Sequence, residues 1–252
     1  MVRLSLGTAI KRSQSMSLKE ILHDGVMDLF SGTQPTSANN VPDSTLLARI
    51  TYGGGSFVAG VTNTRQTGKV VIGTAVEGTT FILTIADVAY TITAVAGDTV
   101  ATIAAKLAAL IHFSCPEADA MSDATDTLYY SARFGGQGFT IVESGTGTLT
   151  LTEWTANSRT VSNGIQFGAA VDNVLYKESG AWSGIVLVGG IVGWCRVRGN
   201  ASDDDSESET ICRVDMSCST SPSADAVISY GNLVKDTVIT VNSFRITEPL
   251  SK

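Results

Sequence analysis

The densest group of ionisable side chains in the sequence is an acidic run, SDDDSESE, at Ser202 to Glu209. Its five carboxylates are those of Asp203, Asp204, Asp205, Glu207 and Glu209. Clustered carboxylates are the ligands that Ca²⁺ prefers, but the run lacks the Asp-x-Asp-x-Asp-Gly order of an EF-hand loop. We therefore expect a solvated, mobile hairpin tip of like charges, which is only a weak candidate for a metal site.

The four cysteines are too few for a disulfide scaffold in a chain of this size. If CRVDMSC is one continuous strand, Cys212 and Cys218 lie about 20 Å apart, well beyond the ~7 Å between Cα atoms that a disulfide spans. Cys195 and Cys212 flank the acidic run and are predicted to face each other on adjacent strands. A disulfide between these two cysteines is one hypothesis, and free buried thiols are the favoured alternative.

Catalytic motifs are missing from the sequence. The only histidines, His23 and His112, have no partner in sequence, and no second ligand pair accompanies His112 and Cys115. There is no nucleophile elbow, P-loop or HExxH helix, and GGQGFT at Gly135 to Thr140 lacks the third glycine of a dinucleotide fingerprint. We therefore predict a protein that is not an enzyme, with no catalytic residue, no cofactor and no metal.

Composition narrows the class of protein further. The 252 residues include 25 glycines, and 43% are hydrophobic, which together with many Thr, Ser and Val residues favours strands and tight turns. The net charge of -7 and the scattered 17 basic residues argue against nucleic acid as a partner. Lys11 and Arg12 interrupt any signal-peptide core, so we expect the chain to be made in the cytoplasm.

One uncharged, largely apolar stretch, AWSGIVLVGGIVGWC, runs from Ala181 to Cys195. It is shorter than the roughly 20 residues of a membrane-spanning helix, and its four glycines and β-branched residues favour paired strands. The prediction is a buried hairpin without membrane insertion.

The elements that position these residues are mostly strands. Ser17 and Glu20 fit a capping box that opens a short helix with its stop at Gly25, followed by strands in VMDLFSG and STLLARIT. The long polar connection between those strands contains Pro35 and Pro42, which prevent regular pairing within it.

Residues 68–155 are predicted to form an inserted α+β module in the order strand, strand, helix, strand, strand, strand. The strands are a hairpin within TTFILTIADVAYTITAV, then TLYYSA, FTIVES and TLTLTEW. Asp98 is the expected cap of the helix, in which Val100, Ile103 and Leu107 recur at helical spacing. The helix is expected to pack on one face of a small mixed sheet.

After residue 155 the chain returns to a strand pattern. In the last strand, strict alternation would place Val238, Thr240, Asn242, Phe244 and Ile246 on one face. We predict a mainly β fold: residues 1–67 and 156–252 form an antiparallel β-sandwich or barrel, an assembly domain that is interrupted by the α+β module.

The sequence LFSGTQPTSANNVPDSTLLARI, from Leu29 to Ile50, resembles an N-terminal signature of tailed-bacteriophage virion proteins. The similarity continues through short motifs in the C-terminal part, at Gly193 and Trp194, at Arg213, Val214 and Asp215, and at Thr237, Val238, Ser243 and Phe244. The inserted segment is similar to a module of phage tail, sheath and fibre proteins, through FILTIADVAYTITAVAGDTVATIAAKLAALI and YYSARFGGQGFTIVESGTGTLTLTE.

This resemblance implies a structural subunit of a virion, located in the neck or collar, the tail, or on the capsid as decoration. Its partners would be copies of itself and other virion proteins. One alternative is a module of a tail fibre that binds a host surface or glycan. The other is a hydrolase that uses paired carboxylates such as Asp203 and Glu207, but no apolar pocket near them in sequence would raise the pKa of one.

Overall fold

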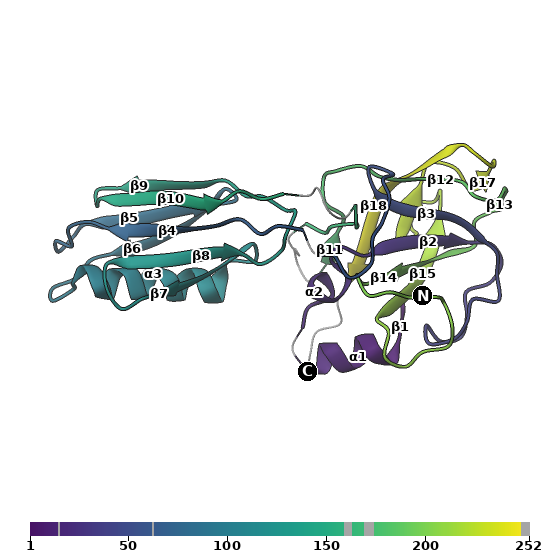
Figure 1. Ribbon diagram of the computed structural model, residues 1–252, viewed down its shortest axis with the longest axis horizontal. Helices are drawn as coiled ribbons and strands as arrows, with labels where there is room; N and C mark the ends of the chain where they lie inside the picture. Colours follow the sequence, from purple (N-terminus) through teal and green to yellow (C-terminus); the bar gives the residue numbers. More distant parts are fainter. Residues whose placement is uncertain (15, 62, 159–162, 169–173, 248–252) are drawn as a thin grey trace. The chain divides into compact units, whose positions relative to one another are not determined.

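The computed structural model describes residues 1–14, 16–61, 63–158, 163–168 and 174–247. It divides into two compact units (Figure 1). The first, here the barrel unit, comprises Met1–Thr62 and Val161–Lys252, and the second, the inserted unit, comprises Asn63–Thr160. These boundaries lie a few residues outside the predicted 68 and 155. No helix among the described residues is long and apolar enough to cross a membrane.

The barrel unit is built on seven strands that close on themselves, which confirms the mainly β prediction and selects a barrel. The strands, in their order around the barrel, are β15 (Arg213–Ser219), β14 (Trp194–Arg198), β2 (Val26–Phe30), β3 (Leu46–Tyr52), β12 (Trp182–Ile185), β18 (Val238–Thr247) and β16 (Ala226–Ile228). Neighbours are antiparallel except β15 and β16, whose parallel pairing closes the ring. The barrel is therefore mixed, where the sequence predicted antiparallel strands only.

Short strands extend this barrel. β1 (Arg3–Leu4) pairs with β15, and β11 (Val174–Tyr176) pairs with β18. β13 (Gly190–Ile191) and β17 (Asn232–Leu233) form a two-stranded ribbon of their own.

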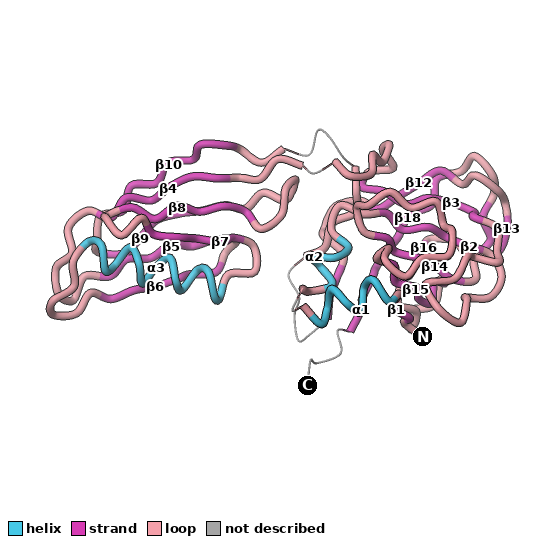
Figure 2. The backbone as a smooth tube through the Cα atoms, turned by 60° about the horizontal axis from the view of Figure 1, so that its bottom comes forward, coloured by secondary structure: helices cyan, strands magenta, loops and turns pink. Residues whose placement is uncertain are grey.

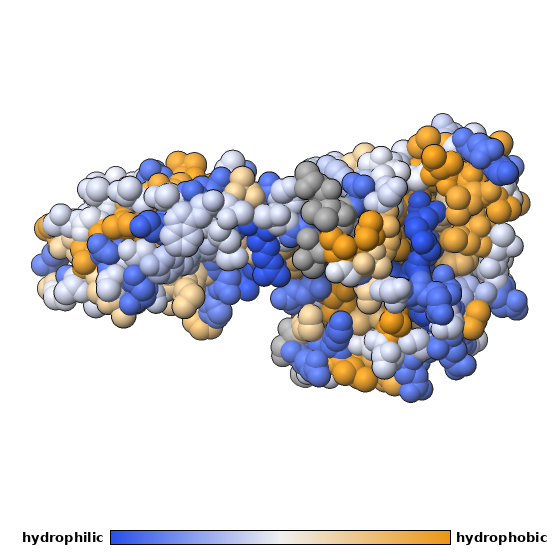
Figure 3. Space-filling model, viewed as in Figure 1, coloured by the Kyte–Doolittle hydropathy of each residue, from blue (hydrophilic) through white to orange (hydrophobic). Residues whose placement is uncertain are grey.

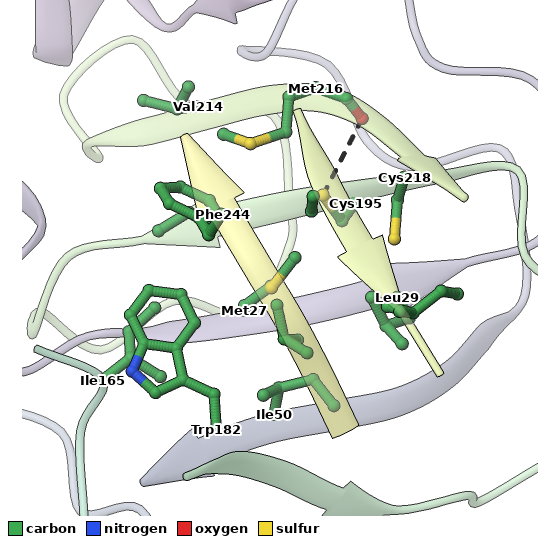
Figure 4. Packing of buried hydrophobic residues seen from close by; sticks show 14 of the residues in the cluster. Met27, Leu29, Ile50, Ile165, Trp182, Cys195, Val214, Met216, Cys218 and Phe244 are labelled. Carbon is green, nitrogen blue, oxygen red and sulfur yellow. Dashed lines mark hydrogen bonds between the residues drawn. The ribbon is translucent and has the colours of Figure 1, made fainter. Parts of the chain in front are cut away.

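The interior of the barrel is filled by side chains that alternate along each strand. Met27 and Leu29 of β2 meet Cys195 of β14, Met216 of β15 and Phe244 of β18 (Figure 4). Burying such side chains stabilises the fold by about 1.5–3 kcal/mol each.

The predicted alternation in the last strand is wrong in its second half. A register shift in the pairing of β16 with β18 falls between Val241 and Ser243, so Ile239 and Val241 are buried, and then Phe244 and Ile246. A bulge inserts one residue and moves every later side chain to the other face.

Two short helices precede the barrel strands. α2 (Leu18–Leu22) carries the predicted capping box between Ser17 and Glu20, and its C-terminal cap is His23, two residues before the expected stop. α1 (Leu6–Ser13), which the sequence analysis did not predict, is capped by the Ser5 hydroxyl.

The inserted unit contains two antiparallel sheets, so the prediction of a single mixed sheet is wrong. One sheet has the order β10 (Leu149–Thr155), β4 (Thr67–Ile72), β8 (Thr127–Ala132) and β7 (Ala118–Ser122). The other has the order β6 (Val88–Thr93), β5 (Thr80–Ile85) and β9 (Ile141–Gly145). Strands β4 and β7 were not predicted.

The helix α3 (Val100–Ser114) packs against β6, β7 and β8 and covers the core of the inserted unit (Figure 2). Its N-terminal cap is Thr99, which forms a capping box with Thr102, so the prediction of Asp98 as the cap is wrong. Asp98 instead accepts hydrogen bonds from the Thr102 hydroxyl and from Lys106 Nζ.

Candidate functional site

A row of alternating charges crosses the outer side of the barrel wall. Its members, at facing register positions of β3, β2, β14, β15 and β1, are Arg49, Asp28, Arg196, Asp215 and Arg3. Opposite charges directly across two strands attract each other, so this row supports the pairing of five consecutive strands.

The middle of the row, Asp28, Arg196 and Asp215, is fully buried although it lies outside the barrel. Cys195 and Val197 point into the core, so the residues between and beyond them, Arg196 and Arg198, point outward. Arg196 is nevertheless fully buried, and its Nε donates to Asp215 Oδ1 over 2.7 Å. Buried charges need partners, and other parts of the chain must therefore shield this row from water.

The acidic run provides part of this cover. Arg198 lies directly opposite Arg213, an arrangement that is unfavourable unless a carboxylate neutralises it. Asp203 does so: its carboxylate accepts from Arg213 Nε over 2.7 Å, and its carbonyl accepts from Arg198 Nη1 over 2.8 Å. Asp205 Oδ1 lies 3.5 Å from Arg196 Nη1.

The prediction of a solvated acidic loop is thus wrong for two of its five carboxylates. The side chain of Asp203 is only 2% exposed and that of Asp205 is 24% exposed, whereas Asp204, Glu207 and Glu209 are exposed as predicted. Among the described residues, no group of three or more His, Cys, Asp or Glu side chains has an arrangement that would hold a metal ion. Asp203 and Glu207 form no acid–base pair, because one is bound to arginines and the other faces solvent.

Burial and arginine contacts act in opposite directions on the pKa of these carboxyl groups. Burial disfavours the charged form of Asp203, but the hydrogen bond from Arg213 and the charge of Arg198 outweigh it, so the pKa of Asp203 is lowered. For Asp215 and Asp205, burial dominates and the pKa is raised. Of these three buried carboxyl groups, Asp203 is therefore the one whose charged form is favoured by folding.

This lowered pKa gives a pH-dependent prediction. Since the pKa of Asp203 is lower in the folded state, its charge stabilises the fold fully above the unfolded value of about 3.9, and this stability is lost as pH falls through the folded pKa. Urea unfolding of Asp203→Asn should show a large loss relative to wild type at pH 7 that shrinks below about pH 4. A loss that stays constant across this range would contradict the assignment.

The long connection from Ser31 to Thr45 provides the rest of the cover. The carbonyl of Asn40 accepts from Arg196 Nη2 over 3.1 Å, and Trp194 Nε1 donates to Ser44 Oγ over 3.4 Å. At Gly193 a Cβ atom would lie 1.9 Å from a carbonyl oxygen of this connection, so only glycine fits. The connection thus lies directly on β14.

All four cysteines are buried free thiols, and the predicted facing of Cys195 and Cys212 is wrong. Cys195 pairs with Met216, and Cys212 lies beside Gly199, at the other end of β14. The Cys195 thiol donates to the carbonyl oxygen of Met216 over 3.8 Å, and burial raises its pKa well above the ordinary value (Figure 4). These thiols are core residues of low reactivity.

A surface that sequence reasoning missed lies at one end of the barrel. The residues of this apolar patch, each between 45% and 71% exposed, are Ile185, Leu187, Val188, Ile191, Tyr230, Val234 and Val238. Ile185 of β12 pairs with Val238 of β18. In the ribbon of β13 and β17, Ile191 pairs with Asn232 and Gly190 pairs with Leu233. Figure 3 shows the patch as a broad hydrophobic area over β12, β13 and β17.

This patch corrects the prediction of a buried hairpin from Ala181 to Cys195. Trp182, Val186 and Trp194 are buried in that segment, but its central part is exposed. The uncharged composition was the available signal, and it indicates burial without indicating whether the chain itself or a partner covers the surface.

A groove of about 410 Å³ lies within the patch. It is lined by Tyr230, Leu233, Val234 and Val238 among others, with the polar side chains of Asn232 and Thr237. The exposed Lys235 and Asp236 follow Val234 in the sequence. An apolar centre with a polar rim is the usual composition of a protein–protein interface.

No protein-family model matches the chain, and no curated protein matches it.

Proposed function

We propose that this chain is a non-enzymatic structural subunit of a tailed-phage virion, in a neck, collar or tail surface, and that it assembles with copies of itself through the barrel unit. The observation that carries the proposal is the apolar patch. Contiguous exposed apolar surface of this kind is rare on soluble monomers and marks an interaction surface. The virion context rests on the resemblance of the strand motifs to phage virion proteins.

Two features of the patch favour a second copy of the chain as its partner. It contains both a row of protruding aliphatic side chains, from Ile185 to Ile191, and a groove that could receive such side chains. It also has no charged side chain from Trp182 to Cys195, and the exposed Lys235 and Asp236 have opposite signs, so two copies in contact need not bury a net charge. Such a surface is compatible with the closed rings of homo-oligomers.

The barrel supplies a rigid base for this contact. The charge row and its cover link β1, β15, β14, β2 and β3, and the patch lies on strands that continue from β3 through β12 to β18. A pre-organised surface loses little conformational entropy on association, and many copies in a ring make weak contacts act together.

Solution mass measured by light scattering tests this proposal. We expect wild type to form species larger than the 26.3 kDa chain in a concentration-dependent manner, and Ile191→Asp to remain monomeric because it places a charge in the interface. The matched control is Val142→Asp, which adds the same charge at an exposed valine of the inserted unit and should leave the mass unchanged. A monomeric wild type, or an unchanged mass for Ile191→Asp, would contradict assembly through the patch.

The virion context is tested separately. Particles of the phage that encodes this chain should contain it in a fixed number of copies by quantitative mass spectrometry, and gold-labelled antibody should locate it on the neck or tail. Absence from purified particles would overturn the virion proposal whatever the result for the apolar patch.

A further inference from the structure

The outer face of the four-stranded sheet in the inserted unit carries a second set of exposed side chains. The pairing register aligns Met121 of β7, Tyr129 of β8, Lys69 of β4 and Thr152 of β10 in one row. The opposite face of this sheet packs on α3 through residues such as Leu128 and therefore belongs to the core. The row thus lies on the face that α3 leaves uncovered.

Two aromatic rings meet on this face. Trp154 extends from β10 toward Tyr129, and their ring centroids lie 5.5 Å apart at an interplanar angle of 41°. Trp154 is 56% exposed, so a large part of its ring is available to a ligand. Aromatic rings pack well against the C–H face of a sugar ring, because the negative face of the π-system attracts these polarised C–H groups.

Lys69 is on β4, the strand between those that carry these two aromatic residues. Among the described residues its ammonium group has no hydrogen bond or ion pair, whereas the carboxylates of Asp119 and Asp123 on the same side of the sheet accept hydrogen bonds. Asp119 bonds to His112, and Asp123 accepts from the Tyr129 hydroxyl over 3.3 Å. These hydrogen bonds leave the carboxylates of Asp119 and Asp123 charged, so on this face a negative group of a ligand is favoured at Lys69 alone.

A shallow cleft of about 290 Å³ lies beside Tyr129. It is lined by His112, Asp119, Met121 and Ser131 among others, so an apolar floor is combined with groups that can bond to hydroxyls. This is the usual composition of a small-molecule site, which is mostly apolar with a few polar groups that fix orientation.

We propose that this face binds an acidic saccharide. Trp154 and Tyr129 pack on the sugar rings, Lys69 pairs with a sugar carboxylate, and Asp119 and Ser131 bond to hydroxyls of a neighbouring ring. A protein partner fits less well, because hydroxyl and charged side chains such as those of Thr152 and Lys69 separate the apolar groups here. The inference is independent of assembly through the apolar patch.

The exposed tryptophan makes the site observable in the full chain. Of the three tryptophans, Trp182 and Trp194 are fully buried, so quenching of fluorescence by acrylamide acts mainly on Trp154. The probes are hexagalacturonate and an oligomer of α2,8-linked sialic acid, and the neutral comparator is fully methyl-esterified hexagalacturonate. We expect at least one acidic probe to protect the tryptophan from quenching, and the ester to protect it about tenfold less well.

Variants test which residues form the site, and the affinity of each variant for the acidic probe is measured by calorimetry. Trp154→Ala should weaken it by at least about tenfold, and Lys69→Gln by about five- to tenfold with a reduced dependence on salt. Tyr176→Ala, which removes an exposed aromatic ring from β11 of the barrel unit, is the matched control and should bind like wild type. No protection by either acidic probe, equal protection by the ester, or unchanged binding by Trp154→Ala would each overturn the proposal.

Discussion

Replacing Asp215 by alanine is expected to lower the free energy of unfolding of the barrel unit by about 3–5 kcal/mol, because it leaves Arg196 buried without its partner. Both side chains are fully buried, and the carboxylate accepts from Arg196 through both Nε and Nη2, at 2.7 and 2.9 Å. Urea unfolding followed by the fluorescence of Trp182 and Trp194, which lie in the same unit, measures the effect.

Two further variants separate loss of an ion pair from loss of a side chain. Asp204→Ala removes an exposed carboxylate from the acidic run and should change stability by less than about 0.5 kcal/mol. The double variant Arg196→Met with Asp215→Leu removes both charges and should recover much of the stability lost by Asp215→Ala. If the double variant were no more stable than Asp215→Ala, the cost would arise from packing and not from an unpaired arginine.

The second large effect is expected from Trp182→Ala, at about 3–5 kcal/mol. Trp182 is fully buried, and its ring centroid lies 5.3 Å from that of Phe167 and 5.2 Å from that of Phe244. Truncation would remove both aromatic contacts and leave a cavity beside β18. Unfolding followed by the fluorescence of Trp194 measures the loss.

Trp182→Phe is the informative companion of this variant. The indole Nε1 of Trp182 is buried and has no hydrogen-bond partner in the described part of the chain, so phenylalanine keeps much of the packing and removes this donor. We expect a loss below about 1.5 kcal/mol for Trp182→Phe. An equal loss for both variants would show that the site tolerates no change of shape.

Local patterns were sufficient for much of the fold. Alternation located the barrel strands, and the capping box at Ser17 and Glu20 is present as predicted. The hairpin of β5 and β6 was predicted as well, and its turn residues Ala86 and Asp87 both have positive φ, as a two-residue hairpin turn requires. In each case the determining interactions lie within a few residues of one another.

The features that were missed depend on contacts between distant residues. Asp203 belongs to the most acidic run of the sequence, and only the pairing of β14 with β15 shows that Arg198 and Arg213 meet there. The bulge in β18 follows from the pairing with β16, and the facing of Cys195 and Met216 follows from strand register. Composition alone determines neither the register of the strands nor which segments shield the buried charges from water.

The ends of the inserted unit lie close together. Thr67 at the start of β4 pairs with Thr155 at the end of β10, and Thr64 bridges to Ser158. In the barrel unit, the amide of Tyr52 donates to the carbonyl of Asn163 over 2.7 Å. The chain therefore leaves the barrel unit after β3 and re-enters it before β12 at nearly the same point.

This proximity favours a folding order in which the inserted unit forms before the barrel closes. β3 and β12 pair in the barrel although about 130 residues separate Tyr52 from Trp182, and closing so long a loop is slow and entropically costly. Once the inserted unit has folded, the flexible part of that loop is about fourfold shorter, which lowers the closure cost by about 1.2 kcal/mol. Folding of the inserted unit before the barrel would therefore bring the two halves of the barrel together and make their pairing less costly.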